Sequence, residues 1–376
     1  MKVNYFVRDV AIFSCLPPEK SGIANYTEDL ILSNRDLTCV ASRFTIEEYR
    51  KLRLTKQTGR PSDSNQFISL DEFKDRIDNF SNKIFVLGNS SHNLFALTNA
   101  IKYGNDKDWV YIHEANLNAL WGSFCNQNLL DFNSFRKKFL VEGRNNLGVL
   151  PLFVLSKIKK VFVNNKLAKE LIEEEIRKSF LKIKVQIEVV FLPLPHIDKK
   201  NIIPKEKREK LIVGTFGIPS DNYKQTNKIV QAVKLLNEKL GCPSTLFIGG
   251  YGSLSYVFDQ AGDELFTYRS EPTEYSDFVK LMSCVDISVQ LRSNPHGESS
   301  GCIQELLALD IPVITTENFV AEVFRNEVYE VSVDVEPIEL AEKILLIRNR
   351  EIRHKLQSKK FSSYDLSLRM LEKLKD

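Results

Sequence analysis

Residues 286–316 read DISVQLRSNPHGESSGCIQELLALDIPVITT, and this stretch decides the class of fold. It opens with an apolar run typical of a buried strand, continues through a polar loop, and then shows an apolar helical pattern over 299–309. A second apolar run, Pro312–Thr315, follows at once. A strand, a helix and another strand in close succession form a βαβ unit, which predicts a parallel sheet.

The same alternation of short apolar runs and helical patterns continues along the chain. In the first half, strands are predicted at Val10–Phe13, Thr38–Ala41, Ile84–Leu87, Trp109–Ile112, Val161–Val163 and Glu188–Phe191. In the second half, they are predicted at Leu211–Thr215, Ser244–Ile248, Leu265–Tyr268, Ile287–Leu291, Pro312–Thr315 and Val328–Val331. The helical patterns include 24–33, 164–177, 227–240, 274–284 and 299–309. We therefore expect an α/β protein with two doubly wound parallel-sheet domains that face a cleft.

A linker separates the two halves. Residues 193–210, PLPHIDKKNIIPKEKREK, combine three prolines with a charge run and have no apolar periodicity. We predict Rossmann-like domains over 1–195 and 211–355, with the linker at 196–210. The last segment, 356–376, is charged and helical, and we expect it to pack back toward the first domain.

Composition indicates a globular protein and excludes several classes. The chain has 376 residues, of which 43% are hydrophobic and 27% charged, and its net charge of +3 does not point to nucleic acid. Charged residues in the first 15 positions argue against a signal peptide, and no apolar run is long enough to span a membrane. The cysteines are scattered singly, as in a cytoplasmic protein with reduced thiols: Cys15, Cys39, Cys125, Cys242, Cys284 and Cys302.

Two loops of the first half place polar residues directly after predicted strands. A helix is predicted to begin near Gly22, whose missing side chain lets a ligand approach the backbone; the alternative is an ordinary loop with Ser21 as N-cap. His92 and His113 follow the next strands. Ligands bind beyond the carboxyl ends of parallel strands, so both histidines are candidates for a site. The alternative is a structural histidine bonded to backbone.

Two loops of the second half carry positive charge. The strand Leu211–Thr215 ends in a turn at Gly217, and Lys224 lies just ahead of the next helix, where its ammonium could meet a phosphate. The alternative is a solvated surface lysine. The loop 291–301 adds Arg292, whose guanidinium can bind an anion in bidentate fashion, and Glu298, which can accept bonds from sugar hydroxyls.

The helix predicted at 299–309 would begin in small residues. Its first-turn N–H groups have no partner within the helix and carry the positive end of the helix dipole, which suits a diphosphate. Those groups belong to Ser299, Ser300 and Gly301. Glu305 lies on roughly the same face as Glu298. The alternative is a serine-capped helix with solvated glutamates.

At this point the motifs resemble those of a known family. The string at 291–301, LRSNPHGESSG, is similar to the LRxPxxGExSG string of retaining GT-B glycosyltransferases of family 4, in particular the bacterial polysaccharide enzymes. PPEKSGIANY at 17–26 is similar to their PPxxSGIAxY, and Gly88–His92 to their GNxxxH with one residue fewer. His113-Glu114 stands where many members end a strand in HD. The motifs fall in order across most of the chain.

The resemblance implies roles for these residues. Glu298 would hold hydroxyls of the donor sugar, and Glu305 the ribose. Lys224 and Arg292 would neutralise the leaving group, and His113 would lie near the donor sugar and the developing cation. The groups lining the diphosphate and the base would come from Gly22, Gly217, Arg269, Ser299, Ser300 and Gly301. Acceptor-side candidates are Tyr26, His92 and Glu114.

The resemblance further implies the reaction. A hexose would pass, with retention of configuration, from a UDP- or GDP-sugar bound by the second domain to a saccharide or lipid-linked saccharide bound by the first, in bacterial surface polysaccharide synthesis. No cofactor is expected. No DxD string follows a strand, so we expect metal-independent transfer. The alternatives are a nucleotide-sugar epimerase of similar fold and an inactive homologue that partners an active transferase.

Departures from the family pattern keep the inactive alternative open. Ile218 occupies a position that is often basic, Glu114 replaces the usual Asp, and Glu298 and Glu305 are one residue closer in sequence than in much of the family. Basic residues beside apolar ones at 135–140 and 157–160 could dock the first domain on the inner face of an anionic membrane. The alternative is a solvated helix face.

Overall fold

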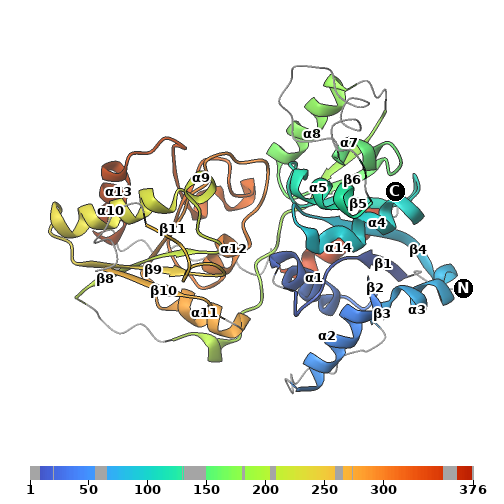
Figure 1. Ribbon diagram of the computed structural model, residues 1–376, viewed down its shortest axis with the longest axis horizontal. Coiled ribbons are helices and arrows are strands. Elements are labelled where there is room, and N and C mark those ends of the chain that lie inside the picture. The colour runs from blue at the N-terminus through green and yellow to red at the C-terminus, as the bar shows by residue number, and fades with distance from the viewer. Residues whose placement is uncertain are drawn as a thin grey trace, which may run out of the picture. The chain divides into compact units, whose positions relative to one another are not determined.

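The computed structural model describes residues 9–19, 21–55, 66–128, 130, 150–179, 183–203, 209–258, 266–272, 274–349 and 362–374. The chain forms two compact units, each built on its own sheet (Figure 1). Unit 1 comprises Met1–Phe191, His296–Glu298 and Ser363–Asp376, and unit 2 comprises Leu192–Pro295 and Ser299–Ser362. The predicted membrane contact at 135–140 and the first residue of the predicted strand Leu265–Tyr268 lie outside the described residues.

Unit 1 contains a seven-stranded sheet with the order β3-β2-β1-β4-β5-β6-β7, in which the pairings are parallel. Its strands are β1 (Asp9–Phe13), β2 (Leu37–Ala41), β3 (Phe67–Ser69), β4 (Phe80–Leu87), β5 (Trp109–Ile112), β6 (Lys160–Val163) and β7 (Gln186–Val189). Every residue of β2 and of β5 is buried, as expected for strands covered on both faces.

Helices cover both faces of this sheet. They are α1 (Gly22–Ser33), α2 (Arg43–Thr55), α3 (Leu70–Asp75), α4 (Leu94–Tyr103), α5 (Asn118–Gln127), α7 (Leu150–Leu155), α8 (Lys166–Lys178) and α14 (Ser363–Leu374), with 3₁₀ turns η2 (Ile77–Asn79) and η3 (Ser91–Asn93). In α8 the buried apolar residues include Ala168 and Ile172, which are one turn apart on the same face of the helix.

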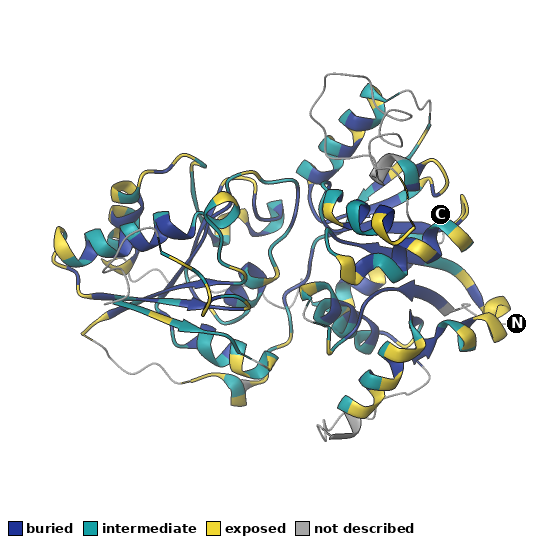
Figure 2. Ribbon diagram, in the orientation of Figure 1, coloured by how far each residue is buried: buried dark blue, intermediate teal, exposed yellow. Residues whose placement is uncertain are grey.

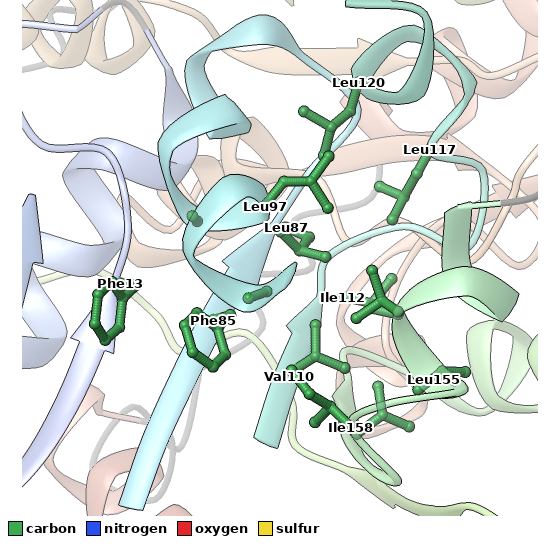
Figure 3. Packing of buried hydrophobic residues seen from close by; sticks show 14 of the residues in the cluster. Phe13, Phe85, Leu87, Leu97, Val110, Ile112, Leu117, Leu120, Leu155 and Ile158 are labelled. Atoms are coloured by element: carbon green, nitrogen blue, oxygen red, sulfur yellow. The ribbon is translucent and has the colours of Figure 1, made fainter. Parts of the chain in front are cut away.

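The alternation of side chains along β1 divides the core of unit 1 into two layers. Ala11 and Phe13 belong to the cluster shown in Figure 3, whereas Val10 and Ile12 belong to the cluster on the opposite face. The second cluster includes three residues of α14, namely Leu366, Met370 and Leu371. Figure 1 shows α14 beside α1, and the Asn34 amide donates to the Ser367 hydroxyl at 3.0 Å. The end of the chain therefore completes the first sheet's core.

Unit 2 contains a six-stranded sheet with the order β10-β9-β8-β11-β12-β13, again with parallel pairings. Its strands are β8 (Leu211–Phe216), β9 (Ser244–Gly249), β10 (Thr267–Ser270), β11 (Ile287–Gln290), β12 (Val313–Thr316) and β13 (Tyr329–Val331). Its helices are α9 (Asp221–Lys224), α10 (Thr226–Glu238), α11 (Tyr275–Ser283), α12 (Gly301–Ala308) and α13 (Pro337–Asn349), with turns η4 (Lys199–Asn201) and η6 (Glu322–Glu327). In α10, buried Ile229, Val233 and Leu236 repeat at helical spacing.

The predicted fold class, with two doubly wound parallel-sheet domains, is confirmed by these two sheets. Each predicted strand overlaps a strand of the structure, and Figure 2 shows the central strands of both sheets as mostly buried. The prediction missed β3, because a three-residue edge strand is too short to show a period. It also named none of the helices described between β2 and β6, which are α2, α3, α4, α5 and α7.

Candidate functional site

Each sheet has one point at which the strand order reverses. In unit 1 this point lies between β1 and β4, and in unit 2 it lies between β8 and β11. The connections after two such strands leave to opposite faces, which opens a crevice at the carboxyl ends of the strands, where doubly wound sheets bind ligands. In unit 2, Gly217 and Lys224 follow β8, while Arg292 and the start of α12 follow β11. Lys224 and Arg292 therefore come from the two connections at the switch point of unit 2.

Lys224 lies at the end of α9 with its ammonium turned back to the end of β8. The ammonium donates to the carbonyl oxygen of Phe216 at 2.6 Å. Gly217, whose φ is +94°, leaves the space that the ammonium occupies, because a β-carbon at Gly217 would clash with it. The interpretation of Lys224 as a solvated surface lysine is thus wrong.

The surroundings of Lys224 favour release of its proton. Loss of water around the half-buried side chain lowers its pKa from 10.5 to about 8, and the charge of Arg292 lowers it further, while Cys302 acts in the opposite direction. In turn, burial raises the pKa of the Cys302 thiol to about 11. An anion beside Lys224 would stabilise the ammonium and return its pKa toward the ordinary value.

Arg292 is held rigidly by aromatic rings. Its guanidinium carbon lies 3.9 Å from the centre of the Tyr223 ring and 4.4 Å from that of Phe319. Its backbone N–H donates to the Thr316 hydroxyl at 2.8 Å, and only 8% of the residue is exposed. The guanidinium is therefore fixed in position next to the α9 loop, close enough for its charge to act on Lys224.

The predicted start of α12 at Ser299 is two residues too early, because the helix begins at Gly301. Of the three residues predicted to supply first-turn N–H groups, only Gly301 lies within the helix. Ser300 is the N-cap, and its hydroxyl accepts a hydrogen bond from the N–H of Ile303. The hydroxyl oxygen of Ser299 is buried and has no hydrogen-bond partner among the described residues. Gly301 is exposed, and a β-carbon there would meet no atom within 4 Å. The cap uses the N–H of Ile303, while the exposed backbone at Gly301 can approach a small anion.

Two further candidates of unit 2 have different surroundings. Arg269, in β10, donates to the carbonyl oxygens of Leu254 and Tyr256, so it braces the loop that follows β9. The carboxylate of Glu305 lies close enough to Cys302 to raise the pKa of its thiol. Glu305 therefore lies near Cys302, whereas the guanidinium of Arg269 donates to carbonyl oxygens of the loop after β9.

Glu298 belongs to unit 1, whereas Arg292 and Ser299–Gly301 of the same motif belong to unit 2. The segment His296–Glu298 packs on unit 1, where the Ala115 N–H donates to the His296 carbonyl at 2.9 Å. At Gly297, whose φ is +77°, a β-carbon would lie 2.5 Å from Ala168, so only glycine permits this close approach. The carboxylate of Glu298 accepts the His296 N–H at 2.6 Å.

In unit 1, His113 lies in a buried aromatic setting at the end of β5. Its ring stacks on Tyr111 with the ring centres 4.5 Å apart, and the Tyr26 ring meets it edge-on at 5.2 Å. The amide of Asn164 reaches the ring nitrogen Nδ1 at 3.3 Å and the His113 carbonyl at 3.0 Å. Burial lowers the pKa of His113 to about 3, so the imidazole is neutral at physiological pH. It can donate or accept a hydrogen bond but does not carry a positive charge.

The remaining candidates of unit 1 lie in the loops after β1, β4 and β5. Gly22 is the first residue of α1 and is exposed, with Ser21 as its N-cap. His92 pairs with Glu19, with Nδ1 and a carboxylate oxygen 3.0 Å apart. Glu114 accepts the backbone N–H of Asn89 at 3.2 Å. Glu114 thereby ties the loop after β5 to the loop after β4.

Sequence reasoning missed Asn164, Glu19 and Cys302. Asn164 follows a predicted strand, as the chosen histidines do, but the helical pattern from 164 onward concealed it; the helix begins at Lys166. Glu19 lies inside a recognised motif at a position that the motif leaves variable. Nothing in the spacing of Cys302 indicates that it lies beside Lys224.

In the part of the chain that the structure describes, no group of three His, Cys, Asp or Glu side chains gathers as metal ligands would. None of the helices in these ranges combines the length and apolar character needed to cross a bilayer.

Comparison with known proteins identifies the fold. The sequence matches no protein-family model and no curated protein. Among solved structures, the chain is similar to HepE (Alr3699) of Anabaena in complex with UDP and glucose, with a TM-score of 0.63, 11% identity and coverage of 98% of this chain and 100% of that one. It is also similar to the trehalose-6-phosphate synthase OtsA, with a TM-score of 0.57, 10% identity and coverage of 98% and 99%. The chain also matches part of a longer protein, in the GtfA/B complex, with a TM-score of 0.48 and 14% identity. That alignment covers 75% of this chain and 60% of the other.

Two parallel-sheet α/β units with these similarities define the GT-B fold of glycosyltransferases. At 10–11% identity, HepE and OtsA show the fold alone. What the chain does must be argued from its own residues.

Proposed function

We propose that this protein is a glycosyltransferase that moves a hexose, with retention of configuration, from a nucleotide-sugar donor to a saccharide or lipid-linked saccharide. The observation that carries the proposal is the group of positive donors at the switch point of unit 2. Lys224, Arg292 and the first turn of α12 supply an ammonium, a guanidinium and open N–H groups within two neighbouring connections. Such a set suits a nucleoside diphosphate.

The same groups suggest how the bond to the donor breaks. Glycosyl transfer separates the anomeric carbon from a phosphate oxygen through a transition state with oxocarbenium character. Negative charge builds up on the departing diphosphate, and positive donors held in place before the reaction stabilise it. Because Lys224 and Arg292 are fixed by Phe216 and by aromatic rings, they need little reorganisation. We propose that these donors serve in place of a metal ion.

Retention is proposed to follow from attack on the face that the leaving group vacates. The acceptor hydroxyl must lose a proton as its oxygen bonds to the anomeric carbon. His113, with its pKa lowered to about 3, is a poor recipient for that proton. A donor phosphate oxygen would take the proton instead, and His113 would contribute a hydrogen bond.

HepE supports UDP as the first nucleotide to test, because its structure contains UDP and glucose. We propose a UDP-sugar donor, with a GDP-sugar as the second choice. On the acceptor side we propose Tyr26, His92 and Glu114 of unit 1, with bacterial surface polysaccharide synthesis as the setting. Contact with an anionic membrane, through the basic residues at 157–160 among others, belongs to the same proposal.

The test is nucleotide release from a panel of UDP-, GDP- and dTDP-sugars, measured with and without saccharide acceptors. If the protein is the proposed transferase, nucleotide is released only when an acceptor is present. Because the proposed transfer needs no metal ion, EDTA should leave the rate of nucleotide release unchanged. An epimerase would change the sugar without acceptor, and a binding protein would release nothing. Either of those results contradicts the proposal.

The variant Lys224→Met assigns the activity to the switch point of unit 2. Removing one fixed donor to a leaving group lowers kcat by about 10²–10³-fold in comparable sites. The matched control is Lys239→Met, which removes an exposed ammonium from the same unit. Equal rates for the two variants would mean that the donor site lies elsewhere.

A further inference from the structure

The orientation of the Asn164 side chain is determined by its two neighbours. One amide atom lies 3.0 Å from the carbonyl oxygen of His113, and a carbonyl only accepts hydrogen bonds, so that atom is the nitrogen. The other amide atom, the oxygen, accepts the hydroxyl hydrogen of Tyr111 at 2.6 Å. Both assignments agree, and Asn164 is itself fully buried.

The second hydrogen of the same amide nitrogen then determines the tautomer of His113. This nitrogen lies 3.3 Å from Nδ1 of the imidazole, and an amide N–H can only donate. Nδ1 must therefore carry a lone pair. In a neutral imidazole the proton is then on Nε2.

A chain of hydroxyls holds the amide in place. Tyr26 donates to the Tyr111 hydroxyl at 3.2 Å, and Tyr111 donates to Asn164. Burial raises the pKa of both tyrosines, so their hydroxyls stay protonated and keep donating. The two tyrosine rings also pack on the His113 imidazole, one face-on and one edge-on. Ring plane, ring position and tautomer are thus set by the same three side chains.

The Nε2 end of the ring is left for a ligand. Nε2 is buried and has no hydrogen-bond partner among the described residues, although His113 is only 8% exposed. A buried donor without an acceptor is unfavourable, so its retention calls for an explanation. An acceptor oxygen of a bound molecule would satisfy it.

We propose that Asn164 is a positioning residue, which holds His113 as the Nε2–H tautomer so that this hydrogen is donated to an oxygen of the bound nucleotide sugar. This inference rests on the proposed function. The ligand chemistry is an oxygen acceptor, either a sugar hydroxyl or a phosphate oxygen. Asn164 acts only through His113.

The direct test reads the imidazole nitrogens by NMR in the full chain labelled with nitrogen-15. The chain contains five histidines, and the signals of His113 are those lost in His113→Gln. We expect a protonated Nε2 and an unprotonated Nδ1 that do not change between about pH 8 and pH 5, because burial keeps the ring neutral. Adding a UDP-sugar should shift Nε2, and UDP alone should do so only if the acceptor is a phosphate oxygen.

The variant Asn164→Asp should reverse the tautomer. A carboxylate has no hydrogen to donate and accepts one from Nδ1, so the proton moves away from Nε2. Turnover should then fall about a hundredfold or more, because the donor toward the sugar is lost, while KM for the nucleotide sugar changes much less. The pH profile of the variant should also change, since the new carboxylate favours the imidazolium.

Asn99→Asp is the matched control, because it introduces a carboxylate at another buried amide of unit 1. It should keep the spectrum of His113 and the turnover. If Asn164→Asp does not fold, Asn164→Ala still tests the tautomer, and it should give a mixture of both forms.

Three results would overturn the inference. They are a protonated Nδ1 in the natural chain, an unchanged tautomer in Asn164→Asp, or a reversed tautomer with full turnover. Failure of the proposed function is distinguishable from all three, because a chain that transfers no sugar still reports its tautomer.

Discussion

At the scale of single residues, a backbone carbonyl and aromatic rings hold the positive groups at the switch point of unit 2 in place. Lys224 is bonded to a backbone carbonyl, and Arg292 lies between two aromatic rings. A carbonyl dipole and aromatic faces hold a cation without neutralising its charge.

The lowered pKa of Lys224 predicts how nucleotide binding depends on pH. The folded chain releases this proton near pH 8 instead of 10.5, so the unfolded state binds more protons in between, and the contribution of Lys224 to the free energy of unfolding rises with pH there. A diphosphate favours the ammonium, so the affinity for UDP should fall above about pH 8, by up to tenfold per pH unit. Calorimetric titration of UDP at several pH values measures this. Lys224→Met should bind weakly with a flat profile; a wild-type profile flat up to pH 10 would contradict the assignment.

Gly217 offers a second prediction at the same scale. Gly217→Ala forces a side chain into a backbone with φ of +94° and into the space of the Lys224 ammonium, so we expect a loss of about 1–3 kcal/mol of stability together with weaker UDP binding. Gly241→Ala is the control, because Gly241 also has a positive φ, of +59°, but has open space around it. It should lower the unfolding temperature and leave UDP binding intact. Equal losses of binding in both variants would mean that Gly217 matters only for stability.

At the scale of elements, the start of α12 combines a structural cap with open N–H groups. Ser300→Ala removes the cap and should cost about 0.5–2 kcal/mol of stability. Because the cap also orders the turn that would meet the diphosphate, UDP affinity should fall as well. Thermal unfolding and UDP titration measure the two effects.

Ser69→Ala provides the comparison, because Ser69 caps α3 of unit 1 through a capping box. It should cause a similar loss of stability without any change in UDP affinity. Unchanged UDP affinity in Ser300→Ala would remove the first turn of α12 from the proposed site.

The elements also show how far the sequence alone could lead. Strand positions were readable, because strands buried on both faces become continuous apolar runs, as in β5. The connections at the carboxyl ends could be found, since chain order places them there. The spatial partner of a side chain could not be found from the sequence. Lys224 lies beside Cys302, and Asn164 beside His113, only because distant segments pack together. The position of Asn164 in a loop was not recognised, because a helical pattern follows it directly. Strand β3 was not recognised, because it is only three residues long.

At the scale of the whole molecule, the two units have separate cores, and we predict that substitutions in each act on that unit. Met370→Ala removes buried volume from the α14 side of unit 1, and Ile344→Ala does the same in α13 of unit 2. Each should cost about 2–5 kcal/mol. In calorimetry, Met370→Ala should lower the unfolding temperature of unit 1, and Ile344→Ala should lower that of unit 2. UDP should raise only the unfolding temperature that Ile344→Ala lowers. Stabilisation of the Met370-sensitive transition by UDP would place the nucleotide in unit 1.

The packing of α14 has a consequence for biosynthesis. A ribosome delivers β1 to β7 first, then the strands of unit 2, and only afterwards α14, which packs against α1 and adds Leu366, Met370 and Leu371 to the core of unit 1. Until then the nascent first domain keeps part of its apolar surface exposed to water and to chaperones. Translation that stalls before residue 363 would therefore release a chain whose second domain is complete and whose first is not.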